Sequence, residues 1–218
     1  MIFKKKIKSH KDKRIFKKVT AEENFKNLIF FSNLIKDLEH FVFFGTLLGL
    51  VREKNLIEGD DDVDFYVNIN EREKLISFLK LNSIVVDETL SVNRNKSFLQ
   101  VYRIHNDVKF ITDFYFYDAN KDKFNIIEKW NFEGGTHIQS KYLRIPKIFI
   151  YPIKTNIIKG HKFFFPSQPV LLCEFLYGPN WNIKMKKDEE YLIKVINNKP
   201  ILFKIKKNFF GMKKIILA

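Results

Sequence analysis

The sequence has very little cysteine and no long apolar run. Cys173 is the single cysteine among 218 residues, which excludes an internal disulfide or a cysteine-rich zinc site and fits a reducing compartment. No apolar stretch approaches the roughly 18 residues that span a bilayer, and no apolar segment of a secretory signal follows the basic N-terminus. We therefore expect a cytoplasmic protein. Its 45% of hydrophobic residues, with 24 phenylalanines, are enough for a globular domain with a real core.

Acidic residues are scarce at both ends of the chain, and this explains much of the net charge of +14. Residues 1–18 contain nine Lys or Arg, and residues 199–218 contain six Lys and no acid. In both ends Lys alternates with Phe, Ile and Leu, which fits peripheral binding at an anionic inner membrane face; the alternative is two solvated, frayed ends. The body between them is close to neutral and lacks a basic stripe, so nucleic acid is disfavoured as a partner.

Hydrophobic periodicity predicts an α/β (α+β) fold with a mixed sheet flanked by helices. A capping box at Thr20 opens a helix that runs to about Glu39. Other helices are expected over 47–52, 71–81, 169–177 and 188–197, strands over 41–44, 63–68, 83–86, 97–104 and 108–117, a strand–turn–strand unit over 149–165, and a loop at 134–135. Without a repeat or a long linker, we assign 1–19 as a basic extension, 20–198 as one domain and 199–218 as a basic amphipathic tail.

Four acids occupy five positions from Asp60 to Asp64. Because side chains alternate along a strand, Asp60, Asp62 and Asp64 are expected to project to one side and Asp61 away from them. Carboxylates a few ångströms apart repel unless they share a proton or hold a cation. Oxygen ligands select Mg²⁺ or Mn²⁺, and Mg²⁺ keeps positions open for substrate phosphates. The cluster therefore predicts a metal–phosphate site; the alternative is a solvated turn or a weak surface Ca²⁺ site.

Residues outside the acidic cluster support this prediction. Gly45 and Thr46 stand at an expected strand-to-helix turn, where a glycine allows close approach and free N–H groups bind phosphate. Asp113 is the single acid inside the aromatic run "KFITDFYFY", and because an unpaired buried carboxylate is costly, we expect it to face the cluster rather than cap a local turn. Arg52 has the planar fork that suits phosphate oxygens, unless it pairs with Glu53 or Glu58.

Three segments together resemble the LicD/fukutin family. They are "GTLLGLVREKNLIEGDDDVDFYV", the later strand "FITDFYFYD", and the closing region "YPIKTNIIKGHKFFFPSQPVLLCEFLYGPNW". The resemblance covers roughly residues 41–181 and implies a nucleotidyltransferase-like fold. It also implies an activity: transfer of a phospho-alcohol, such as phosphocholine, ribitol phosphate or glycerol phosphate, from its CDP-activated form to a glycan or lipid-linked glycan.

The resemblance also implies roles for individual residues. Asp62 and Asp64 would bind Mg²⁺ or Mn²⁺, with Asp60 and Asp113 completing the site. Gly45, Thr46 and Arg52 would hold phosphate oxygens. An acceptor hydroxyl would attack the distal phosphorus while Asp113 takes the proton, so that Asp62, Asp64 and Asp113 are the candidate catalytic residues.

Two other functions remain open at this point. A nucleotidyltransferase that moves NMP from an NTP to a small molecule or protein would use the same Gly-Thr and Asp-x-Asp pattern. A non-catalytic module that binds membrane or nucleic acid through its basic ends would leave the acids without a role. Three histidines could assist catalysis, although histidines in or beside loops are more often structural or solvated: His105, His137 and His161. Three aromatic residues could stack on a base or sugar, although such residues more often belong to the core: Trp130, Tyr177 and Trp181. Cys173 is expected to pack in the core.

Overall fold

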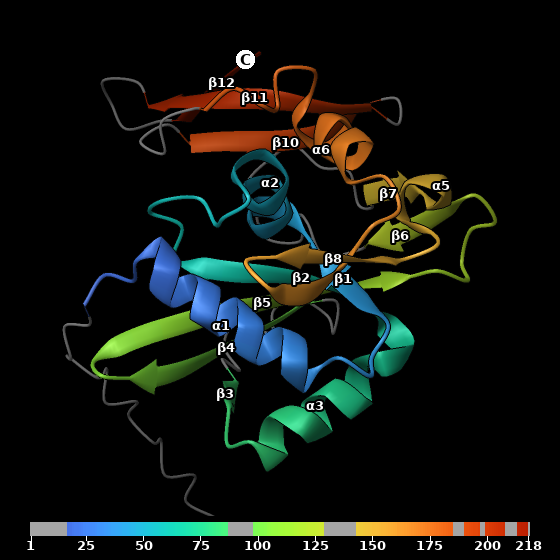
Figure 1. The fold of residues 1–218 in the computed structure, drawn as a ribbon. Helices are drawn as coiled ribbons and strands as arrows, with labels where there is room; N and C mark the ends of the chain where they lie inside the picture. Colours follow the sequence, from blue (N-terminus) through green and yellow to red (C-terminus); the bar gives the residue numbers. More distant parts are fainter. Residues whose placement is uncertain are drawn as a thin grey trace, which may run out of the picture.

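A mixed β-sheet forms the centre of the protein, seen in a computed structural model that describes residues 17–86, 98–128, 143–184, 190–196, 199–207 and 213–217. The sheet has seven strands in the order β1-β2-β5-β4-β3, and β6 joins β5 to β7 (Figure 1). Its strands are β1 His40–Val42, β2 Asp62–Asn68, β3 Val85–Val86, β4 Phe98–His105, β5 Val108–Asp118, β6 Asn125–Glu128 and β7 Leu143–Pro146. The predicted mixed α/β class is confirmed.

Helices flank this sheet, as the periodicity predicted. They are α1 Ala21–Leu34, α2 Phe44–Glu53, α3 Arg72–Leu81, α5 Lys147–Ile150 and α6 Pro169–Tyr177, with a 3₁₀ turn, η1, at Ile69–Glu71. Helix α1 begins at the predicted capping box: the Thr20 hydroxyl accepts from the Glu23 N–H at 3.2 Å. Its apolar positions Phe25, Leu28 and Phe31 recur every three residues and are buried against the sheet.

The pairing of β2 with β5 positions the acids. These two strands run parallel, and the register places Asp64 opposite Asp113. Apart from their acids, both strands are rich in buried aromatic residues, among them Phe65, Tyr66 and Phe114. Burial on both faces of the sheet accounts for the nearly continuous apolar sequence of these strands.

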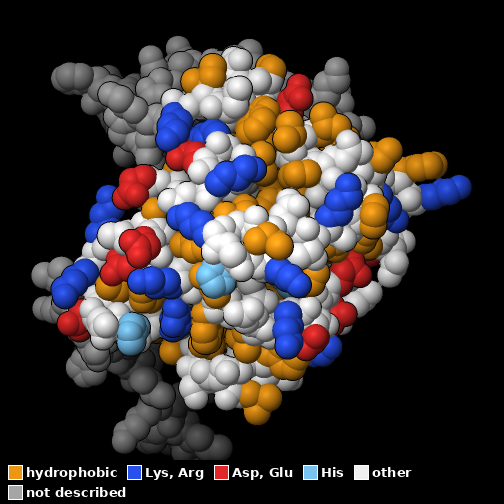
Figure 2. Space-filling model, viewed as in Figure 1, with side chains coloured by type: hydrophobic (Ala, Val, Ile, Leu, Met, Phe, Trp, Pro, Cys, Tyr) orange, Lys and Arg blue, Asp and Glu red, His pale blue; other side chains and the backbone are white. Residues whose placement is uncertain are grey.

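A β-hairpin lies beside α1 and β1. It consists of β8 Lys154–Ile158 and β9 His161–Phe165, and Phe163 meets Phe25 of α1 edge-on with ring centroids 5.7 Å apart. The strand predicted from residue 149 was wrong at its start, since 147–150 form the short helix α5. The space-filling view shows apolar side chains gathered where α5 and α6 lie on this face (Figure 2).

The C-terminal strands form a separate three-stranded antiparallel sheet, β10 Glu190–Ile196, β11 Lys199–Lys207 and β12 Lys213–Leu217, with β11 next to α6. The helix predicted over 188–197 was wrong. The segment "EYLIKVI" is rich in aromatic and β-branched residues, and all seven residues pair with β11. The proposed division of the chain at 19 and 198 stays a prediction, as does binding of the basic ends to membrane.

Four strands were not predicted, and some expected features lie outside the described residues. Strands β6 and β7 are short, and β11 and β12 lie in the segment that was expected to be a basic amphipathic tail. The 134–135 loop, His137, Trp130 and residues 1–16 lie outside the part of the chain that the structure describes. Among the residues that it does describe, no helix is long and apolar enough to cross a bilayer.

Candidate active site

Three carboxylates from two neighbouring strands converge at the start of β2. Asp62 and Asp64 lie on β2 and Asp113 on β5, and one oxygen of each lies within 4.8 Å of the others. Asp64 and Asp113 are buried, whereas Asp62 is half-buried and faces solvent in part. The structure thus brings together acids that are far apart in the sequence, and it leaves one side of the group accessible.

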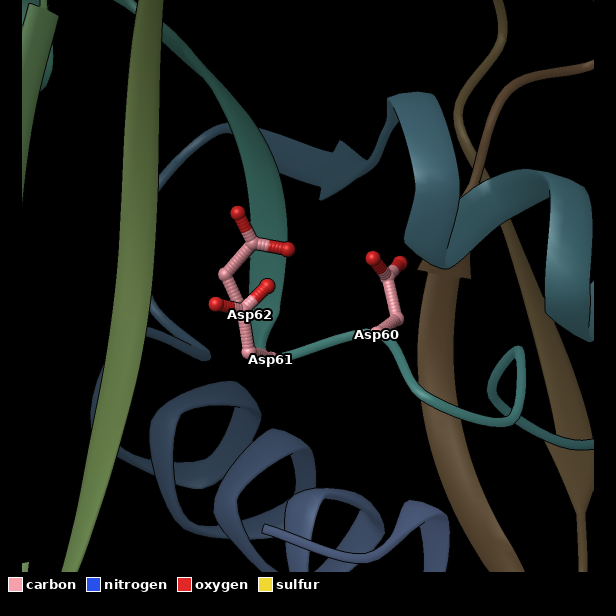
Figure 3. Close-up of side chains that lie close together, drawn as sticks. All are labelled: Asp60, Asp61 and Asp62. Carbon is pink, nitrogen blue, oxygen red and sulfur yellow. The ribbon is translucent and has the colours of Figure 1, made fainter. Parts of the chain in front are cut away.

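A second set of carboxylates lies on the turn before β2. Oxygens of Asp60, Asp61 and Asp62 also lie within 4.8 Å of one another (Figure 3). The prediction that Asp61 points away from its neighbours was wrong. Residues 60 and 61 precede the strand, so the alternation of side chains begins only at Asp62.

The first turn of α2 closes over the acids. The Thr46 hydroxyl accepts from the Asp64 N–H at 2.8 Å, and the Thr46 N–H approaches Asp64 Oδ2 at 3.4 Å. A Cβ placed on Gly45 would lie 2.7 Å from Asp60 Oδ2, so this position has no room for a side chain while Asp60 keeps its place. Phe44 just before it has a φ of 36°, an uncommon value for a residue other than glycine. The predicted Gly-Thr turn therefore lies against the acids, within the helix rather than before it.

The electrostatics of the group favour a bound cation. Burial raises the pKa of Asp64 well above its usual range, and the charges of Asp62, Asp113 and Asp60 raise it further, against a lowering by the Thr46 N–H. Such a group binds either a proton or a metal ion. The donors are all carboxylate oxygens, the chemistry that Mg²⁺ and Mn²⁺ prefer, so the residues present fit such an ion.

Two strand side chains fix Asp113. Gln100 on β4 lies opposite Asp113 in the strand register, and its Nε2 donates to Asp113 Oδ1 at 2.8 Å. The Tyr115 hydroxyl lies 3.4 Å from Asp113 Oδ2. Sequence reasoning missed Gln100, although an amide within the apolar run "FLQVY" was a signal.

Helix α1 holds the acidic turn through its backbone. Asn24, fully buried, donates from Nδ2 to the carbonyl oxygens of Asp62 at 2.7 Å and Asp60 at 3.4 Å. One turn on, Asn27 donates to the Thr112 hydroxyl at 3.0 Å, next to Asp113. Both residues were missed because they were not distinguished from the polar face of an amphipathic helix. Two asparagines on the buried face of α1 therefore anchor both acid-bearing strands.

Arg52 interacts with a neighbouring acid. Its Nε and Nη2 donate to Glu53 Oε1 at 3.0 and 2.6 Å, and Lys184 Nζ donates to Glu53 Oε2 at 2.8 Å. This is one of the ion pairs considered from the sequence. A role for Arg52 in binding phosphate stays a prediction.

The end of α6 borders the acids. Burial raises the pKa of Tyr177 well above its usual range, and the charges of Asp64 and Asp60 add to this effect, so the phenol lies within their field. Cys173, one turn earlier, is buried and free, as expected for a core residue. His105 and His161 are exposed at hairpin turns, while Trp181 packs partly against the core.

Acids on adjacent parallel strands lie beside a Gly-Thr helix start, and the family match assigns this arrangement to a group-transferring enzyme with a nucleotidyltransferase-type domain. The model of the family described as "LicD/FKTN/FKRP, nucleotidyltransferase domain" matches residues 37–168, more than half of the chain. The protein therefore belongs to the LicD/FKTN/FKRP family, and the predicted resemblance is confirmed. This match includes the acidic cluster, Asp113 and the β8–β9 hairpin, but begins after α1.

The comparison with solved structures gives a more distant similarity. A lincomycin-bound lincosamide antibiotic adenylyltransferase, LnuA, is similar over 72% of this chain and 85% of its own, with 18% identity and a TM-score of 0.46. The comparison with curated proteins gives no match.

Proposed function

We propose that this protein transfers a phospho-alcohol from a CDP-activated donor to a hydroxyl of a cell-surface glycan or lipid-linked glycan and releases CMP. Phosphocholine, ribitol phosphate and glycerol phosphate are the candidate groups. Family membership supports the reaction class. The observation that carries the proposal is the convergence of Asp62, Asp64 and Asp113 beside the first turn of α2.

A divalent cation is part of this proposal. Asp62, Asp64 and Asp113 would hold Mg²⁺ or Mn²⁺, with Asp60 at the edge of the site. A bound cation would offset the negative charge of the pyrophosphate and of the leaving CMP. The raised pKa of Asp64 supports this assignment, because the charge of the neighbouring carboxylates needs compensation.

The proposed reaction forms one bond and breaks one bond at the distal phosphorus, and the remaining site residues have roles in this exchange. The acceptor oxygen forms a bond to the distal phosphorus of the donor, and the bond from that phosphorus to the bridging oxygen breaks, so that CMP leaves with the electron pair. Asp113 takes the proton of the acceptor hydroxyl, with its carboxylate oriented by Gln100 and Tyr115. Gly45, without a side chain, lets the start of α2 lie against the Asp60 carboxylate, and this turn, with Thr46 and Arg52, would contact the phosphate oxygens.

The test is CMP release from CDP-choline, CDP-ribitol and CDP-glycerol with Mg²⁺ or Mn²⁺. We expect metal-dependent release with one donor, reduced at least roughly 100-fold in Asp62→Asn, because loss of a direct ligand should exceed the roughly 10–100-fold effects of outer-shell changes. Asp107→Asn is the matched control: Asp107 is exposed at the β4–β5 turn, and this variant should keep full activity.

The other outcomes are distinct. Turnover of NTPs with pyrophosphate release, and none with CDP compounds, would identify an NMP-transferring enzyme instead. Failure of every CDP compound and NTP to bind in the presence of metal would contradict an enzymatic role for the acids.

A further inference from the structure

Four large aliphatic side chains are exposed on adjoining elements. Ile148 of α5 and Ile157 of β8 are each 67% exposed, and Val170 and Leu171 at the start of α6 are 50% and 42% exposed. Gln168 connects α5 to α6, since its Nε2 donates to the Ile148 carbonyl at 3.3 Å. Single exposed aliphatic residues are ordinary, whereas several on adjoining elements suggest a contact surface.

Two shallow hollows make this area continuous. One, of about 370 Å³, lies between Lys154 and the first residues of α6, including Val170 and Leu171. The other, of about 230 Å³, lies between Lys54 at the end of α2 and Ile157 of β8. Pro169 lines both hollows, so aliphatic surface extends from β8 to α6, with a lysine at each hollow. We refer to Ile157, Pro169, Val170 and Leu171 with Lys54 and Lys154 as the lysine-rimmed surface.

The segment that supplies most of this surface carries an excess of positive charge. Residues 147–184, which supply α5, β8, β9 and α6, contain five lysines and a single acid, Glu174. Lys54, Lys154 and Lys162 are exposed, and Lys162 lies directly opposite Ile157 in the hairpin. In the space-filling view, Lys or Arg side chains stand among the apolar side chains on this face (Figure 2). Exposed aliphatic groups with surrounding lysines complement hydrocarbon beneath a layer of anionic phosphate.

We infer that the lysine-rimmed surface binds an anionic membrane surface, with the aliphatic side chains in the interfacial layer and the lysines at the lipid phosphates. This binding site is part of the folded domain and includes no residue of the basic ends of the chain, 1–18 and 199–218. Helix α2 connects it to the acids: its first turn contacts Asp64, and Val51 and Lys54 at its other end line the smaller hollow. Ten helical residues span roughly 15 Å, so a bound protein would hold its candidate active site near the bilayer.

The experiment measures sedimentation of the full chain with phosphatidylcholine vesicles that contain or lack phosphatidylglycerol. We expect binding to the anionic vesicles, weakened roughly 10-fold or more in the triple variant Ile157→Ser/Val170→Ser/Leu171→Ser, because three aliphatic side chains no longer enter the interface. Leu81→Ser is the matched control. Leu81 is 81% exposed at the end of α3, so its substitution should leave vesicle binding unchanged.

A charge variant makes the test independent of folding defects. In Lys54→Gln/Lys154→Gln both changed side chains are exposed, and we expect weaker binding at low salt with an unchanged melting temperature. Unchanged binding in both multiple variants would show that other parts of the chain, such as its basic ends, carry the interaction, and would overturn the inference. Equal binding to neutral and anionic vesicles, or no binding to either, would overturn it too.

Discussion

Asp64 shows at the scale of single residues how this site depends on its neighbours. It is 5% exposed, lies opposite Asp113, and exchanges contacts with Thr46 through both its backbone and its side chain. The acids themselves were apparent in the sequence, but the groups that orient them were not. Gln100 donates to the Asp113 carboxylate and Asn24 donates to the Asp62 carbonyl, although neither residue belongs to the acidic pattern.

Gln100 provides the first residue-scale prediction. Gln100→Ala removes the hydrogen bond to Asp113 Oδ1 and lets this carboxylate rotate, so we expect Mn²⁺ affinity to fall roughly 10–100-fold. Direct titration of Mn²⁺ by electron paramagnetic resonance measures this without an assay of turnover. Gln168→Ala, which removes an amide bonded to the Ile148 carbonyl away from the acids, is the control and should bind Mn²⁺ like the wild type. Equal affinity of Gln100→Ala and the wild type would show that Gln100 does not position the site.

At the scale of elements, α2 has two glycines with different roles. A Cβ on Gly45 would meet a side-chain oxygen, Asp60 Oδ2, at 2.7 Å. A Cβ on Gly49 would meet backbone atoms, the Asn55 oxygen at 2.7 Å and the Ile57 nitrogen at 2.9 Å. A side chain can rotate away, whereas the backbone of 55–57 cannot move without disturbing the turn that leads to the acids.

We therefore expect Gly49→Ala to affect mainly the stability of the fold and Gly45→Ala to affect mainly metal binding at the site. Gly49→Ala should lower the free energy of unfolding by about 1–3 kcal/mol, as overpacking does. Gly45→Ala should change stability little, because alanine favours the helix and Asp60 can rotate, yet it should weaken Mn²⁺ binding and CMP release. Urea unfolding and Mn²⁺ titration of both variants provide the comparison. If Gly45→Ala binds Mn²⁺ normally, the close approach of this turn to Asp60 has no part in the site.

At the scale of the whole molecule, His40 makes the free energy of unfolding depend on pH. Burial lowers its pKa to about 4, although the contact of Nδ1 with the Leu38 carbonyl opposes this. Its ring packs edge-on against Phe65 and Phe164 and connects the sheet to the hairpin. In the unfolded chain, histidine takes up its proton near pH 6.5, so the unfolded state binds more protons between these values.

The free energy of unfolding should therefore fall as the pH drops from about 6.5 to 4. One proton over this window corresponds to roughly 3 kcal/mol. His40→Phe keeps an aromatic ring and removes the proton, so the wild type should lose more stability than this variant across the window. Urea unfolding of both proteins at a series of pH values measures the difference in their free energies of unfolding. The acids contribute equally to both proteins, so their contributions cancel in this difference. His105→Asn, at an exposed turn, should behave like the wild type, and parallel pH curves for wild type and His40→Phe would contradict the prediction.

The sequence by itself determined the elements whose cause is local. The capping box at Thr20, the apolar run of β2 and the acidic cluster each depend on residues a few positions apart. Local pattern also has a limit: residues 190–196 fit a helix by spacing, yet they form β10, since pairing with β11 decides the conformation of such apolar segments.

Only the tertiary structure decided which residues meet. The parallel register of β2 and β5 places Asp113 beside Asp64, and β4 then carries Gln100 to the same point. Asn24 reaches the acidic turn because α1 packs across these strands, and Tyr177 enters the field of the acids because α6 packs on α2. These contacts join distant parts of the chain. They depend on how whole elements pack, which no short stretch of sequence specifies.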